Sequence, residues 1–457
     1  MSKKLFEDFK EVSAKEWKQK IQVDLKGADY ESLLFHSNEG IDVKPFYHQD
    51  NFEPSHAPTS LQPWKITERF IISENTTAAS LLESLEKGAE ALWLVIPSAE
   101  INFSNLLTEI DIENTPIFLD FQFLSKETPQ QLKEIVQGKK HQISVSVDIV
   151  GHLSATGNWF SNQQEDHQIL AEFIQLNKEI PTQLSVDTSI YQNAGANIVQ
   201  QLAYAMAHVN EYLNHLNEHF PQQLKEFQPT FKVATGSNYF FEIAKLKALR
   251  QLYASLASAY EAPETIQILA FPTRRNKTIY DYNVNMLRTT TESMSAILGG
   301  ANWVCNLPYD EIYHHDNDFG RRIARNQLLI LKEESYFDKV ANASDGSYYV
   351  EEITSQLAEK ALEIFKSIEK AGGWITSLKE GTIQRKIKES ANKELAQFND
   401  AEKTLVGTNK YQNPEDKMKA DLEKSPFLQK NERKTLLKPI IQKRLAEKSE
   451  QQRLETE

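Results

Sequence analysis

The sequence has little that could cross-link a chain or attract a polyanion. It contains one cysteine, Cys305, among 457 residues, which excludes an internal disulfide framework and a cysteine-rich zinc module. Positive charge is also scarce, because 51 Lys and Arg residues face 64 Asp and Glu residues, for a formal charge of −13. An acidic chain without a dense basic stripe disfavours nucleic acid and anionic membranes as primary partners.

Long apolar runs are missing as well. No run approaches the roughly 20 residues that span a bilayer. The charged first residues, MSKKLFEDFKEVSAKEW, contain no apolar centre of a secretory signal. We therefore expect a cytoplasmic protein. With 40% hydrophobic and 25% charged residues, the composition is typical of a globular chain that buries a large core.

Short runs rich in Val, Ile and Phe recur along the middle of the chain. Gly, Pro, Asn or Asp bounds each run, as expected of strands that are buried on both faces. The runs are 69–72, 91–96, 116–123, 143–149, 183–189, 230–235, 266–271 and 302–307. Apolar spacings of three and four predict helices between them, for example over 197–216, 239–260 and 286–297. This alternation predicts an α/β fold, a (β/α)₈ TIM barrel, with an open doubly wound sheet as the alternative.

The segments that flank the barrel are different. The sequence divides into an N-terminal arm, the barrel and a C-terminal helical segment with a charged tail, over residues 1–62, 63–350 and 351–457. The arm is irregular and rich in proline, so we expect it to contact another subunit rather than to form its own core. Within the last segment, the Lys- and Glu-rich stretch 416–457 predicts an exposed helix or a frayed tail.

Barrel enzymes carry their chemistry at the carboxyl ends of the strands. The polar residues at these ends are Asp120, Asp148, Asp187, Thr188, Ser189, Asn306 and the stretches 235–238 and 273–275. Asp148 and Asp187 follow neighbouring strands, so they are candidates for a general acid/base pair. Capping of the following helices is the alternative interpretation of both carboxylates.

Three further features have a functional and a structural interpretation. His314 and His315 stand in an acidic loop that could hold a metal ion or lie in solvent. Arg274 and Arg275 end the seventh predicted strand, where barrels often bind phosphate, or they form ion pairs at a subunit interface. Cys305 lies in an apolar strand and is expected to be a small buried hydrophobic residue.

Several long segments closely resemble methylmalonyl-CoA mutase. They are YFFEIAKLKALRQLYA (239–254), VNMLRTTTESMSAILGGANW (284–303), FGRRIARNQLLILKEESYFDKVANASDGSYYVEEIT (319–354) and VGTNKY (406–411). The resemblance implies a barrel whose axis holds the pantetheine of an acyl-CoA. It also implies a separate domain that binds adenosylcobalamin through the His of a DxHxxG motif, and a radical rearrangement of the carbon skeleton.

The chain departs from that catalytic pattern. It contains no DxHxxG motif, so we expect the cobalamin-binding domain to be absent. The family's GYHMQEAGA corresponds to TSIYQNAGA, which puts Ile190 in place of its His and Asn193 in place of its Glu. Gln267 falls where the family has an Arg, and Cys305 where it has a His. These positions are degenerate, so we assign no catalytic, cofactor-binding or metal-binding residue to this chain.

The stretch from Arg274 to Thr290, with its TRR and NMLRTT motifs, resembles the small, non-catalytic subunit of heterodimeric mutases. The resemblance implies a catalytic large subunit as partner, and adenosylcobalamin bound by that partner and not by this chain. Bulky side chains in the strands at 91–96, 116–123 and 302–307 also favour a filled barrel interior. The alternatives are an acyl-CoA-binding half that works with a separate cobalamin-binding protein, and a stand-alone hydrolase that uses Asp148 and Asp187.

Overall fold

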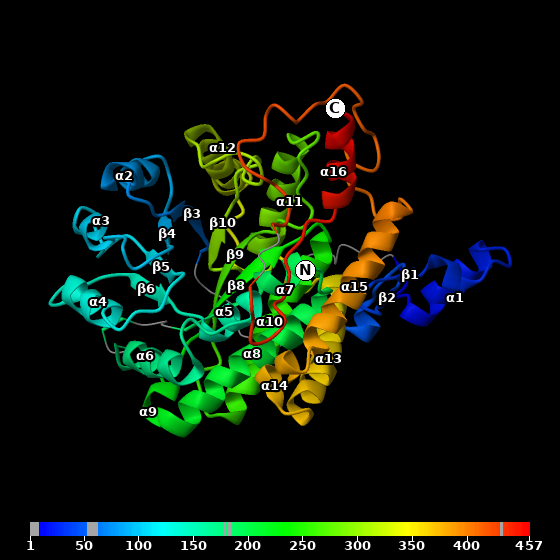
Figure 1. Cartoon of the computed structure of the whole chain (residues 1–457). Coiled ribbons are helices and arrows are strands. Elements are labelled where there is room, and N and C mark those ends of the chain that lie inside the picture. Colours follow the sequence, from blue (N-terminus) through cyan, green and yellow to red (C-terminus); the bar gives the residue numbers. More distant parts are fainter. Residues whose placement is uncertain (1–8, 53–62, 177–178, 181–183, 430–432) are drawn as a thin grey trace, which may run out of the picture.

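The computed structural model describes residues 9–52, 63–176, 179–180, 184–429 and 433–457. Eight parallel strands form one sheet that curves into a barrel (Figure 1), in the order β6-β5-β4-β3-β10-β9-β8-β7. The strands are β3 (Lys65–Ile71), β4 (Ala91–Ile96), β5 (Ile117–Phe121), β6 (Ile143–Ser146), β7 (Ser185–Asp187), β8 (Thr230–Thr235), β9 (Gln267–Pro272) and β10 (Trp303–Cys305). The predicted TIM-barrel fold is confirmed, and every predicted strand is found.

The barrel closes between β6 and β7, at a boundary that we call the seam. Among the described residues, the seam has one bridge between strand backbones, from Val147 to Leu184. Ser185 N donates to Val147 O over 3.2 Å, and the hydroxyls of Ser146 and Ser185 lie 2.7 Å apart. The other neighbouring strands pair over two to six residues. Among the described residues, the seam therefore has the fewest paired strand residues of any junction in the wall.

Helices surround the sheet, as the apolar spacings predict. The predicted helices correspond to α8 (Ile198–His219), α10 (Tyr239–Ala259) and α11 (Val284–Leu298). The remaining helices near the barrel are α2 (Ala78–Glu86), α3 (Ser104–Thr108), α4 (Thr128–Val136), α5 (Ile149–Thr156), α6 (Gln163–Gln175), α7 (Ser189–Ala194), α9 (Pro221–Leu224) and α12 (Asp318–Leu329), which runs into a π-helical turn at Ile330–Glu334. Asn197 starts α8 with a capping box that includes Gln200.

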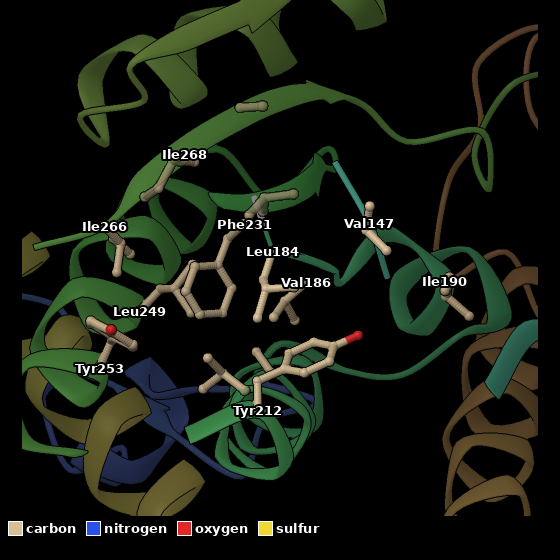
Figure 2. Packing of buried hydrophobic residues seen from close by; sticks show 14 of the residues in the cluster. Val147, Leu184, Val186, Ile190, Tyr212, Phe231, Leu249, Tyr253, Ile266 and Ile268 are labelled. Carbon is tan, nitrogen blue, oxygen red and sulfur yellow. The ribbon is translucent and has the colours of Figure 1, made fainter. Parts of the chain in front are cut away.

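The main core lies between the outer face of the sheet and these helices. Alternate strand residues point outward, and Figure 2 shows Phe231 of β8 among Leu249 and Tyr253 of α10. The rings of Phe231 and Tyr253 have centroids 5.9 Å apart. Both side chains are fully buried, and each such aromatic contributes about 1.5–3 kcal/mol on burial.

The N-terminal arm has little burial of its own. Its α1 (Ala14–Asp24) buries no residue and projects from the body of the molecule (Figure 1). The turns Tyr30–Leu33 and Gln49–Asn51 and the hairpin of β1 (Phe35–His36) and β2 (Asp42–Val43) complete its regular structure. Asn38 and Gln397 exchange side-chain hydrogen bonds of 2.8 and 3.2 Å, which attaches the hairpin to the C-terminal helices.

The C-terminal segment begins with the three helices α13 (Tyr348–Lys370), α14 (Gly373–Lys379) and α15 (Thr382–Asn399). The expectation of an exposed helix or frayed tail for 416–457 is met in part, because most of the described residues there are exposed, but several are buried. Only α16 (Glu447–Thr456) is helical there, and Leu437, Ile440 and Arg444 are buried. Charge density suggests exposure, but Arg444 forms a buried ion pair of 2.6 Å with Glu450. In the part of the chain described here, no helix combines the length and apolar character needed to cross a membrane.

Candidate functional site

The carboxyl ends of the strands converge on one mouth of the barrel, where the sequence predicts the functional residues. A buried lysine, Lys232 of β8, lies at the centre of the charges there. Its Nζ is 3.2 and 3.1 Å from the two carboxylate oxygens of Asp120 and 3.7 Å from Asp187. Trp93 Nε1 also donates to Asp120 over 3.0 Å. The mouth therefore holds a closed ion network rather than a free reactive group.

Electrostatics keep Lys232 charged. Burial alone lowers the pKa of a lysine, but the charges of Asp120 and Asp187 outweigh it and raise the pKa of Lys232. Burial raises the pKa of Asp187, against the attraction of Lys232. Lys232 is not among the predicted site residues, although one charge inside the apolar strand TFKVAT is a signal for a buried ion pair.

The structure brings Asp148 and Asp187 together, as the sequence predicts. The contact joins the Asp148 carboxylate to the backbone of Asp187 and not to its side chain. Asp187 N donates to Asp148 Oδ2 over 2.9 Å. The other Asp148 oxygen accepts from Gly151 N (2.7 Å), His208 Nε2 (2.9 Å) and Tyr212 Oη (2.7 Å). Burial opposes the ionised form, yet His208 and these donors lower the pKa of Asp148 to about 2. Asp148 thus caps α5, and both of its oxygens accept hydrogen bonds from within the fold.

The four degenerate family positions occupy different places. Ile190 and Asn193 lie on α7 at the mouth, and Ile190 is buried in the main core (Figure 2). Asn193 Oδ1 accepts from Thr273 Oγ1 (2.7 Å) and from the Arg274 backbone (3.1 Å). Gln267 starts β9 and so lies at the opposite, amino end of the barrel.

Cys305, the fourth of these positions, lies on β10 inside the barrel. Its side chain is completely buried, and burial raises the pKa of its thiol to about 12. A thiol in this state is neutral at physiological pH and neither attacks an electrophile nor binds a metal ion. The expectation of a small buried hydrophobic residue is confirmed.

Apolar side chains fill most of the barrel interior. The buried interior cluster consists of Trp93, Phe118, Ala234, Leu269, Phe271, Cys305 and Leu307. The rings of Trp93 and Phe271 are 5.2 Å apart between centroids, and those of Phe118 and Trp303 are 6.4 Å apart. Together with the Lys232–Asp120 ion pair, these rings are buried inside the barrel, whose interior is normally a packed core.

The arginine pair at the end of β9 serves packing. Arg274 forms an ion pair of 2.6 Å with Glu311. Arg275 is largely buried and contacts Glu394 over 2.5 Å, and its Nη1 donates to Lys443 O over 2.8 Å. Glu311 and Glu394 therefore already neutralise the two arginines of this candidate phosphate site.

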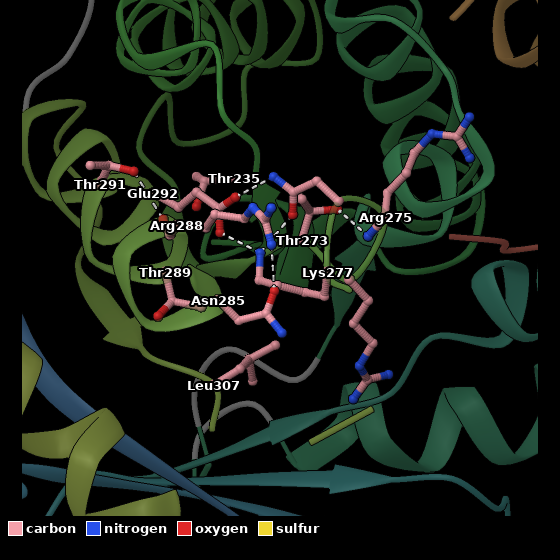
Figure 3. A network of polar contacts seen from close by, with 12 residues as sticks. Thr235, Thr273, Arg275, Lys277, Asn285, Arg288, Thr289, Thr291, Glu292 and Leu307 are labelled. Carbon is pink, nitrogen blue, oxygen red and sulfur yellow. Dashed lines mark hydrogen bonds and ion pairs between the residues drawn. The ribbon is translucent and has the colours of Figure 1, made fainter. Parts of the chain in front are cut away.

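The stretch that carries the family-like TRR and NMLRTT motifs forms a polar network (Figure 3). Glu292 of α11 pairs with Lys277 over 2.7 Å and accepts from Asn276 over 2.6 Å. Burial raises the pKa of Glu292 and lowers the pKa of Lys277. Asn285 Nδ2 donates to Thr278 O over 2.8 Å. These contacts fix the loop after β9 against α11.

Residues 433–446, which we call the strap, run across the mouth. Backbone N–H groups of the strap donate to Gly157 and Ser154 after β6, to Asn193 after β7 and to Arg275 after β9, over 3.0, 2.9, 3.0 and 2.8 Å. Gly157 permits this packing because its φ is 80°, and a Cβ there would lie 2.4 Å from Leu437 O. The strap thus covers loops where a barrel enzyme would bind substrate.

The histidine loop lies beside a separate pocket of about 280 Å³ between β3 and α12. His314 Nδ1 is 3.1 Å from Asp310, and its Nε2 is 3.1 Å from Asp421 O. These acceptors outweigh burial and raise the pKa of His314. Within the described ranges, no three His, Cys, Asp or Glu residues are grouped as a metal site.

Comparison with known proteins gives consistent results. Residues 101–456 match the family model described as methylmalonyl-CoA mutase. A methylmalonyl-CoA mutase small subunit from Porphyromonas gingivalis is 34% identical over 444 residues, which cover 90% of this chain and 71% of the relative. A small subunit from Streptomyces virginiae is 31% identical, with 71% and 54% covered. A methylmalonyl-CoA mutase from Rhizobium meliloti is 29% identical, with 88% and 64% covered. The chain thus spans less than two thirds of the last two relatives.

Proposed function

The chain belongs to the methylmalonyl-CoA mutase family of isomerases, and from this premise we propose that it is the small subunit of a heterodimeric methylmalonyl-CoA mutase. The complex interconverts methylmalonyl-CoA and succinyl-CoA, and this chain supports the catalytic large subunit without carrying out the reaction. Two of the relatives described above are themselves named small subunits, which supports this choice within the family.

The filled barrel interior is the observation that carries the proposal. The resemblance implies that a catalytic mutase holds the pantetheine of its acyl-CoA along the barrel axis. Here the rings of Trp93, Phe118 and Phe271 are buried within the barrel, and the Lys232–Asp120 pair lies in the same interior, each side chain about 5% exposed or less. A CoA thioester would have to displace these groups, at a cost of several kcal/mol for the ion pair alone.

The degenerate positions support the same conclusion. Ile190 has an alkyl side chain, which neither donates nor accepts a proton. Asn193 uses its side-chain oxygen to hold Thr273 and Arg274, so its amide serves the fold of the mouth. Neither residue is therefore able to move a proton at the acyl end of a substrate.

We assign adenosylcobalamin, the cofactor that the family implies, to the large subunit. The sequence has no DxHxxG motif to supply a cobalt ligand. His208, a histidine near the mouth, is completely buried and already contacts Asp148 and Tyr191 over 2.9 and 2.8 Å. His208 is therefore not available as a cobalt ligand.

The N-terminal arm is the surface that we propose for the large subunit. Apolar side chains on the arm are exposed: Phe9 is 74% exposed, Val23 71% and Phe35 60%. Exposed apolar groups that cluster on one segment are typical of a protein–protein interface. A chain lacking residues 1–30 should fold but should no longer form a stable heterodimer, and full recovery of the heterodimer would contradict this part of the proposal.

Co-expression with a large subunit that carries DxHxxG tests the proposal. We expect both chains to elute together at equal stoichiometry and to convert methylmalonyl-CoA only when both are present with adenosylcobalamin. Turnover by the isolated chain would reject the proposal. Calorimetry with methylmalonyl-CoA separates the alternative, because micromolar binding to the isolated chain would indicate an acyl-CoA-binding half instead.

A further inference from the structure

A groove of about 390 Å³ lies between α15 and the strap, on the outer side of the mouth. We propose that this groove, the strap groove, binds a small organic anion that has an apolar body and a carboxylate or phosphate head. The site is separate from the barrel interior and goes beyond the proposed function, which assigns this chain no ligand. The volume matches that of a pocket for one small molecule rather than a surface for a docked helix.

Positive charge defines the rim of the strap groove. Six cationic side chains line it, and none of the described lining residues is acidic. Three of the six, Arg275, Lys443 and Arg444, form ion pairs with carboxylates that do not line the groove. The other three are Lys388, Lys438 and Lys448. Lys388, Lys438 and Lys448 are exposed, and the structure records no ion pair for any of them with another described residue. On a chain with a net charge of −13, such a concentration of cations favours an anionic ligand.

A buried arginine supplies a fixed donor. Arg444 is 6% exposed, and its Nε and Nη1 donate to Pro426 O (3.1 Å) and Lys277 O (2.9 Å). Among the described residues, its buried Nη2 has no hydrogen-bond partner. A buried donor left unpaired costs about 1–3 kcal/mol. An anionic oxygen in the groove would satisfy this donor with a charge-assisted hydrogen bond.

A second buried polar atom lines the same groove. Gln384 of α15 is 7% exposed, and its Nε2 donates to Leu378 O and Lys438 O over 3.0 and 2.7 Å. Its Oε1 is buried without a partner among the described residues. This oxygen only accepts hydrogen bonds, so it would contact a protonated hydroxyl of the ligand's head group, while Arg444 would contact an anionic oxygen.

Apolar side chains form the rest of the lining. They are Ala194, Ile387, Ala391, Leu395, Pro439, Ile440, Ile441 and Leu445. Ile441 is 46% exposed although it lines the groove, so an apolar ligand body would remove it from water at a gain of about 25 cal/mol per Å². Inorganic phosphate alone would leave the apolar lining of the groove exposed to water. The lining therefore selects an anion that carries an alkyl or aromatic body.

Calorimetry on the full chain tests the strap groove with octyl phosphate and octanoate as probes, below their micellar concentrations. We expect one molecule to bind per chain, and the stronger of the two probes shows whether a phosphate or a carboxylate head is preferred. Inorganic phosphate and 1-octanol should each bind at least about tenfold more weakly than that probe. Equal binding of inorganic phosphate, or no binding of either probe at millimolar concentration, would overturn the proposal.

Charge-reversal variants identify the site. Lys388→Glu with Lys438→Glu should weaken binding at least about tenfold. Lys393→Glu with Lys366→Glu is the matched control on exposed residues outside the groove, and it should leave binding unchanged. Equal loss in both variants would indicate general charge attraction and would overturn the site.

The apolar part of the proposal has its own variant. Ile441→Asn removes an exposed apolar wall and should weaken octyl phosphate but not inorganic phosphate. Equal effects on both probes would overturn the apolar requirement. A glutamate-rich peptide that binds with the same dependence on Lys388 and Lys438, while both octyl probes fail to bind, would show that the groove takes an acidic protein segment instead.

Discussion

The barrel interior buries charge, whereas the N-terminal arm exposes apolar side chains. Lys232 and Asp120 are about 5% exposed or less inside the barrel, but Val23 and Phe35 of the arm are 71% and 60% exposed. These residues are thus exceptions to the usual distribution, in which charged side chains are exposed and large apolar ones buried. The interior is stable because its charges are paired and its rings packed, and the arm requires a surface that this chain does not supply. The contrast distinguishes a region that is stable within the chain itself from a region that requires a partner surface.

The largest expected effect concerns the reactivity of the single thiol, which lies in the barrel interior. Cys305 is fully buried and its pKa is about 12, so at pH 8 only about one thiol in 10⁴ is ionised. Modification by iodoacetamide should be at least about a thousandfold slower in the native chain than in denaturant. The measurement is the rate of mass increase. Rapid labelling of the native protein would show that the interior opens, which would contradict the stated difference between a stable interior and an exposed arm.

The buried ion pair should give the next largest effect. Asp120→Ala leaves Lys232 with only the more distant Asp187, so the free energy of unfolding should fall by roughly 3–5 kcal/mol. Asp120→Leu combined with Lys232→Met removes both charges and should cost less than the single change. Urea unfolding followed by circular dichroism measures both variants. If the double variant is as unstable as the single one, packing and not charge pairing controls the interior.

Acid should weaken the mouth through Asp148. The pKa of Asp148 is about 2, below the ordinary value near 3.9. Its stabilisation, about 2 kcal/mol, is therefore complete above about pH 4 and is lost as the pH falls toward 2. Asp148→Asn should remove this part of the pH dependence of the unfolding free energy. Asp24→Asn, on the exposed α1, is the control, and an equal change in both variants would contradict the assignment.

The arm should show the smallest effect on folding. Val23→Asp should change the unfolding free energy by less than about 0.5 kcal/mol, because Val23 is 71% exposed. The same change should weaken the heterodimer, as measured by analytical ultracentrifugation with the large subunit. Val406→Asp, at a position that is 45% exposed outside the arm, is the control and should leave assembly intact. An unaffected heterodimer in Val23→Asp would remove this helix from the proposed interface.

The sequence predicts the repeating parts of the fold well. Runs such as 230–235 and 266–271 are apolar on both faces, which a buried parallel strand requires, so each strand is recognisable by itself. The pairing of Lys232 with Asp120 is not predictable in this way, because it depends on closure of the barrel and joins strands that are distant in sequence. The capping role of Asp148 was one of two open interpretations, and only the positions of His208 and Tyr212 decide between them.

The strap is the part that sequence patterns misrepresent. Its residues have no helical or alternating periodicity, and its order comes from backbone hydrogen bonds to loops after β6, β7 and β9. Arg444 and Glu450 resemble solvated charges in the sequence, but they are buried as a pair. Local propensity contains no information about such partners, which explains why the buried residues of this stretch are not predicted.

The seam between β6 and β7 gives the strap a further consequence. Leu437 and Ile440 attach to the loop region on the β6 side, and Lys443 attaches to Asn193 on the β7 side, so the strap spans the junction that has the fewest strand contacts. During synthesis the strap leaves the ribosome after every strand of the wall. In the nascent chain, the strap therefore does not yet span the seam when the strands of the wall have been synthesised. A chain truncated before the strap should be cleaved by proteases first at the seam.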